Sequence, residues 1–142
     1  MVGVKFVASR YSELLVGVPS IDREHRVLIG LLRPLRYAPP IGGIRSEPFG
    51  DILGQIGNQM IEHFDNEEII LKSCGMPVEQ VADHVRAHGD IIRQYTELQF
   101  DLMWGTPPAY SQVIEMIQAW ILFHLLEYDL SIMPVTTRQH LA

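Results

Sequence analysis

The chain has 142 residues, of which 47% are hydrophobic and 20% charged, so a packed core is expected and global disorder is excluded. Its net charge of −6 argues against nucleic acid as a partner, because a phosphate-binding face needs excess positive charge. Cys74 is the only cysteine, which excludes an intrachain disulfide and fits a reducing compartment. No signal peptide or membrane span is evident, so we expect one soluble, cytoplasmic domain over 1–142.

Hydrophobic periodicity predicts helices along the chain, and strand signals are almost absent. The pattern favours an all-α, up-down-up-down four-helix bundle. The expected helices cover about 20–33, 49–73, 78–103 and 109–132, between an N-terminal arm (1–19) and a C-terminal tail (133–142).

Local signals predict where these helices begin and end. Ser20 is the expected N-cap of the first helix, and Pro34 is expected to end or kink it. Gly75 is the expected C-terminal signal of the second helix. Three glycines weaken the predicted start of that second helix: Gly50, Gly54 and Gly57.

Polar side chains interrupt the apolar face of every predicted helix. In the stretch MIEHFDNEEIILKSC, His63 and Glu67 fall in phase between Met60 and Ile70, where a bundle would bury Leu or Ile. Burying an unpartnered polar group costs roughly 2–7 kcal/mol, so these side chains require partners in the interior. Five of the six histidines share this inward phase: His25, His63, His84, His88 and His124.

Each of these signals is weak when taken alone. A single histidine on an apolar face is most often a core residue with an ordinary hydrogen bond, and HxxxH or HxxxE patterns are common on helices. The joint pattern over four helices indicates a metal site instead, because cations replace the missing water around buried imidazoles and carboxylates. Other polar residues are expected to be solvated: Glu62, Glu68, Glu127 and His140.

The spacing of the polar residues limits which of them can meet. Residues four apart differ by about 40° around a helix, so His63 and Glu67 can converge on one point. His124 and Asp129 are five apart, about 140°, so either the metal pair is wide or this helix contains a wide turn. The mixed nitrogen and oxygen donors are too many for one zinc and suit two ions of iron, or of manganese.

The sequence resembles the hemerythrin family, and specifically its single-domain bacteriohemerythrins. The matching segments are VGVPSIDREH, HFDNEE, HVRAH and WILFHLLEYD, in family order and over nearly the whole chain. The resemblance departs from the family pattern at Arg10, where Trp is usual, and at Glu24, where Gln is usual. An Asn is missing from LIGLL, and the connection from Pro77 to His84 is slightly longer.

The resemblance implies a centre of two iron ions (Fe²⁺/Fe³⁺) with a bridging oxo or hydroxo group and dioxygen as its ligand. It assigns three histidines to one iron and two to the other, with both carboxylates bridging. The implied metal ligands are His84, His88 and His124 for the first ion, His25 and His63 for the second, and Glu67 and Asp129 for the bridges.

Reversible dioxygen binding for transport, storage or delivery is the function that the resemblance implies, rather than an enzyme activity. Apolar neighbours are expected to form the oxygen pocket, with an ordinary core role as the alternative: Ile121, Phe64, Leu28 and Trp120. A sensor acting through a partner protein, a peroxide or nitric oxide reductase, and a metal-free structural bundle are the other functions considered. A monomer or a small homo-oligomer is expected, and no protein partner is identified by the sequence.

Overall fold

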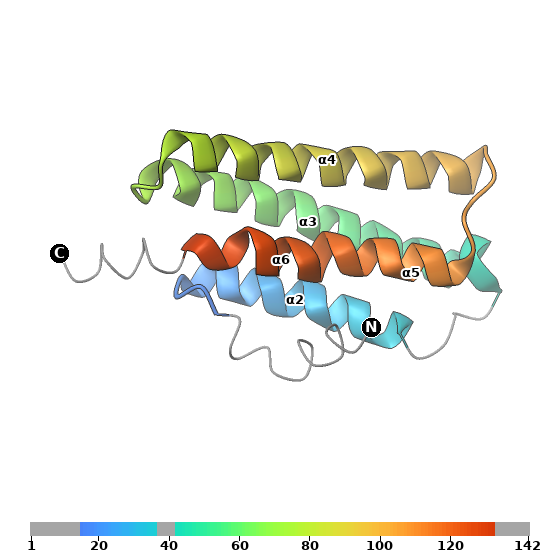
Figure 1. Ribbon diagram of the computed structural model, residues 1–142. Coiled ribbons are helices and arrows are strands. Elements are labelled where there is room, and N and C mark those ends of the chain that lie inside the picture. Colours follow the sequence, from blue (N-terminus) through green and yellow to red (C-terminus); the bar gives the residue numbers. More distant parts are fainter. Residues whose placement is uncertain (1–14, 37–41, 133–142) are drawn as a thin grey trace.

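The computed structural model describes residues 15–36 and 42–132. Arg10, His140 and the tail 133–142 lie outside these described residues. Every regular element in the described ranges is helical, and four helical rods run side by side in alternating directions (Figure 1). The predicted all-α four-helix bundle is therefore confirmed.

The first three rods are single α-helices: α2 (Pro19–Leu35), α3 (Glu47–Ser73) and α4 (Val78–Met103). A short 3₁₀ turn, η2 (Gly43–Arg45), precedes α3. The fourth rod is divided into α5 (Tyr110–Gln118), η3 (Ala119–Phe123), α6 (His124–Glu127) and η4 (Asp129–Ser131). Within the described ranges, no helix combines the length and the apolar character that a membrane crossing needs.

The beginning of α2 differs from the prediction, because Ser20 does not cap it. The helix starts one residue earlier, at Pro19, whose fixed φ suits the first helical position and whose missing N–H costs nothing there. Asp22 secures this end instead: its carboxylate accepts hydrogen bonds from the backbone N–H groups of Val16 (2.8 Å) and Gly17 (3.3 Å). Gly17 has φ of 88°, a left-handed conformation that favours glycine.

The other helix ends show which of the predicted start and stop signals are correct. Pro34 lies inside α2, which continues to Leu35, so this proline does not end the helix at once. Ser46 caps α3, since its hydroxyl oxygen accepts a hydrogen bond from the N–H of Phe49 at 3.2 Å. Gly75 follows α3 with φ of 84°, as a C-terminal glycine should.

The fourth rod changes its winding twice. Residues Ala119–Phe123 form a π-helical turn, and the N–H of His124 bonds back to the carbonyl of Ala119, five positions earlier. A second change follows at Tyr128, whose φ of −117° interrupts the helix before the 3₁₀ turn η4 begins at Asp129. The rod thus contains a wide turn, but that turn lies before His124 rather than between His124 and Asp129.

The apolar core has two parts. A large cluster fills most of the bundle from α2, α3, α4 and the fourth rod, and a small one lies at the turn from α3 to α4 and contains Leu71, Cys74, Met76 and Ile132. Along α3 the large cluster ends at Phe64 and the small one begins at Leu71. Glu67 lies in this interval and His63 directly precedes Phe64, so the polar residues of α3 lie where the two apolar clusters meet.

Helix α3 passes close to a tyrosine of α4 at one glycine. A Cβ added at Gly57 would stand 2.2 Å from Cζ and Oη of Tyr95. The Tyr95 hydroxyl donates to the carbonyl of Leu53 at 3.3 Å, and its ring packs edge-on against Trp120. Gly57 is therefore required here for close approach of the two helices, despite its poor helix propensity.

We expect Gly57→Ala to lower the free energy of unfolding by about 1–3 kcal/mol, because Tyr95 must be displaced from its packed position. Gly54→Ala is the matched control: nothing lies within 4 Å of a Cβ there, so better helix propensity should stabilise the chain by up to about 1 kcal/mol. Urea unfolding followed by circular dichroism measures both variants. Equal effects of the two substitutions would contradict the close contact.

Candidate metal centre

The seven polar side chains predicted for the site are all buried, and they come from all four rods. Their ligand atoms form two groups, in each of which the atoms lie within 4.8 Å of one another. The first group contains Glu67, His84, His88, His124 and Asp129, and the second contains His25, His63, Glu67 and Asp129. The two groups therefore share both carboxylates.

The two oxygens of Glu67 face opposite sides of the site. Oε1 lies 2.6 Å from Nε2 of His84 and 2.9 Å from Nε2 of His88, both on α4. Oε2 lies 3.3 Å from Nε2 of His63, one turn earlier on α3 itself. Glu67 thus has one oxygen directed to each group of histidines.

Asp129 divides its oxygens in the same way from the fourth rod. Oδ1 lies 2.8 Å from Nε2 of His84 and 3.0 Å from Nε2 of His124. Oδ2 lies 2.8 Å from Nε2 of His25, a residue 104 positions earlier in the chain. Two carboxylates arranged in parallel in this way have the geometry needed to link two cations held by separate sets of imidazoles.

Three buried polar atoms of the cluster have no hydrogen bond of good geometry in the described part of the chain, although the last two lie close to another polar atom of the site: His25 Nδ1, Glu67 Oε2 and His124 Nε2. A carboxylate oxygen and an imidazole nitrogen without a good hydrogen bond are costly in an apolar interior. Imidazole and carboxylate donors without a thiolate suit iron among the transition metals. The donor set and these three atoms therefore fit metal ions at the centre of this cluster.

A bacteriohemerythrin from Stenotrophomonas maltophilia (strain R551-3) is 24% identical to the chain over 113 residues. The aligned part covers 80% of this chain and 71% of that protein. This similarity and the buried cluster of histidines and carboxylates support a relationship to the hemerythrin family. No protein-family model matches it, and no solved structure matches it.

A carboxylate that is not part of either ligand group forms a hydrogen bond with one histidine of the site. Nδ1 of His63 donates a hydrogen bond to Glu24 of α2 at 2.9 Å, and Asn66 donates to the other oxygen of the same carboxylate. Burial raises the pKa of Glu24, but these hydrogen bonds outweigh it and leave the pKa below its usual 4.5. Glu24 is therefore an ionised partner of one site histidine.

Glu68 has the equivalent position on the other side of the site. Nδ1 of His88 donates to its carboxylate at 2.9 Å, and the Glu68 side chain is 25% exposed. The prediction that Glu68 is simply solvated was wrong. A helical-wheel pattern cannot reveal this contact, because it depends on how α3 and α4 are aligned with each other.

The four residues predicted for an oxygen pocket are all buried, and Phe64 and Trp120 line two different cavities. Phe64 stacks on His88, with the rings nearly parallel and 4.1 Å apart, and lines a pocket of about 430 Å³ with Glu68. All four, Ile121 and Leu28 included, belong to the large apolar cluster, and their role toward oxygen stays a prediction.

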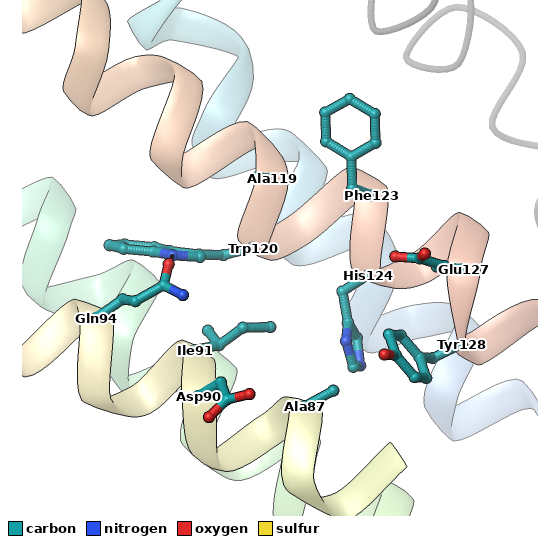
Figure 2. A pocket seen from close by; sticks show the side chains of 10 residues that line it. All are labelled: Ala87, Asp90, Ile91, Gln94, Ala119, Trp120, Phe123, His124, Glu127 and Tyr128. Carbon is teal, nitrogen blue, oxygen red and sulfur yellow. Dashed lines mark hydrogen bonds between the residues drawn. The ribbon is translucent and has the colours of Figure 1, made fainter. Parts of the chain in front are cut away.

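Trp120 lines a separate cleft of about 230 Å³ between α4 and the fourth rod (Figure 2). Its indole N–H donates to Gln94 at 2.9 Å, which orients the ring along the cleft. His124 and Tyr128 lie at the other end of this cleft, with their rings stacked 5.1 Å apart. The wall of the site is therefore thin beside His124.

In the metal-free chain the histidines and carboxylates form charge-assisted pairs. Burial lowers the pKa of His84, but hydrogen bonds to Asp129 and Glu67 outweigh it and raise the pKa to about 9. The same carboxylates, with Glu24, raise the pKa of His63 well above 6.5. Burial raises the pKa of Asp129, yet close polar contacts with His124, His25, His63 and His84 hold it well below 3.8.

The metal-free chain should lose stability as the pH rises from about 6.5 to about 9. Folded His84 keeps its proton up to about pH 9, whereas an unfolded histidine loses it near pH 6.5. The stabilisation is complete below pH 6.5 and amounts to at most about 3 kcal/mol. Denaturant unfolding at several pH values measures it.

His84→Gln is the control for this pH dependence, because it removes the titrating group and keeps a side chain that forms hydrogen bonds. The stability of this variant should change less over the same pH range. An unfolding free energy that stays constant or rises between pH 6.5 and 9 in the unsubstituted chain would contradict the assignment.

Proposed function

We propose that this chain is a non-haem di-iron protein that binds dioxygen reversibly. The observation that supports it most directly is the division of two shared carboxylates between two sets of histidines. Glu67 and Asp129 each direct one oxygen to either side, so neither group of ligands is complete without them. The similarity to a bacteriohemerythrin supports iron as the metal.

His84, His88 and His124 would hold one iron, and His25 and His63 the other, with Glu67 and Asp129 shared by both. A pair of iron ions supplies dioxygen with two electrons that can be returned. The side with two histidines has fewer protein donors, which leaves room for a small ligand there.

The surrounding side chains keep water and stray protons away from this centre. Leu28, Phe64 and Ile121 are each at most 5% exposed. A dry wall of this kind strengthens the electrostatic interactions inside it and slows side reactions that need water or a proton. The same side chains also stabilise the fold, since they belong to the large apolar cluster.

Metal analysis of the purified chain tests the proposal most directly. We expect about two iron atoms per chain and a visible absorption band that disappears on deoxygenation and returns with oxygen. Rapid turnover of peroxide or nitric oxide would indicate an enzyme instead. A folded chain that takes up no iron on anaerobic reconstitution would rule the proposal out.

His63→Ala should reduce the iron content to one atom per chain or fewer, because one of the two ions would retain a single histidine. Glu62→Ala is the matched control, since Glu62 precedes His63 on α3 and is exposed. Elemental analysis gives the metal content, and circular dichroism confirms that both variants remain helical. Iron at the wild-type level in His63→Ala would refute the ligand assignment.

Ile121→Glu should shorten the lifetime of the oxygenated protein, because a carboxyl group in the dry wall brings protons and water to the site. Ile121→Leu keeps the wall apolar and serves as the control. The rate of autoxidation is measured from the decay of the visible band in air. An unchanged rate in Ile121→Glu would show that this residue does not protect the centre.

A further inference from the structure

Two carboxylates outside the ligand set each hold one histidine of the site. On the basis of the proposed di-iron function, we propose that Glu24 and Glu68 are positioning residues that tighten metal binding and favour the oxidised state. Each acts through the Nδ1 atom of a histidine whose Nε2 atom faces the centre.

The contacts are the same on both sides of the site. Glu24 extends from α2 to His63 of α3, and Glu68 extends from α3 to His88 of α4, each over 2.9 Å. The Glu24 side chain is 16% exposed, and Asn66 anchors its second oxygen. One histidine of each ligand group is therefore held by a carboxylate from the preceding helix.

These hydrogen bonds select the tautomer that a metal requires. An Nδ1–H that donates to a carboxylate leaves the lone pair on Nε2, and Nε2 is the atom directed at Glu67 in both His63 and His88. His25 shows the contrast, since its Nδ1 is buried without a partner in the described part of the chain. Glu24 and Glu68 thus pre-orient two of the five imidazoles.

The negative charges of Glu24 and Glu68 favour a bound cation, as does the hydrogen-bonding geometry of these two residues. Glu67 and Asp129 supply two negative charges at the centre, and Glu24 and Glu68 add two more across the width of an imidazole ring. Ferric ions carry more positive charge than ferrous ions, so added negative charge at low dielectric stabilises the ferric state more. The expected consequence is a lower reduction potential.

The test compares Glu24→Gln and Glu68→Gln with Glu62→Gln. Glutamine removes the charge and keeps an oxygen that can accept from Nδ1, so it separates charge from simple positioning. Glu62 is an exposed glutamate of α3 that precedes His63, and it provides the same charge change at a residue that is not the Nδ1 partner of His63 or His88. Two quantities are measured on the full chain: Fe²⁺ affinity by anaerobic titration against a chelator, and the midpoint potential of the iron-loaded protein.

We expect Glu24→Gln and Glu68→Gln to weaken Fe²⁺ binding by about 10- to 100-fold and to shift the midpoint potential upward. The shifts should be roughly additive in the double variant, because the two glutamates act through different histidines. Glu62→Gln should match the wild type. Circular dichroism of the metal-free variants checks that the bundle is intact.

Affinities and potentials of Glu24→Gln and Glu68→Gln that match those of Glu62→Gln would overturn this inference while leaving the proposed function in place. Weaker binding without any shift in potential would show a structural role alone and would also overturn it. A wild-type chain that takes up no Fe²⁺ would instead defeat the proposed function, and the inference with it.

Discussion

Glu67 and Asp129 are buried inside an apolar bundle, and each needs donors on two sides because its oxygens face opposite groups of histidines. In the described part of the chain, the two carboxylates and five imidazoles are each at most 5% exposed, so water cannot solvate them fully. The surrounding fold satisfies most of these atoms by mutual contact and leaves a few without a hydrogen bond of good geometry. The position of the site where the two apolar clusters meet, and the contribution of every rod to it, follow from this requirement.

Helical periodicity was sufficient to predict which side chains face inward. His25, His63 and His124 interrupt apolar faces at positions where only inward-directed side chains fit, and the structure buries all three. The four-rod architecture follows from the same apolar faces, because each apolar face must be covered by another helix. These features depend on spacing within one helix, and a single sequence contains that information.

Features that depend on winding or on the alignment of two helices were not predictable in this way. The π turn at Ala119–Phe123 and the break at Tyr128 have no distinctive residue pattern, and the break at Tyr128 lies between His124 and Asp129. Glu68 looks like any exposed helix glutamate until α4 places His88 beside it. Ser20 matched a capping signal, but Pro19 offers a competing start one residue earlier.

The separation of 104 positions between His25 and Asp129 has a consequence for folding, metal uptake and degradation of the protein in the cell. If these residues bind iron as proposed, the ligand set is complete only after the last helix has docked, so nascent or partly folded chains would not retain iron. Bound iron would then favour the intact bundle by mass action, and cellular proteases would remove mainly chains that lack it. Iron supply would in this way set how much of the protein accumulates.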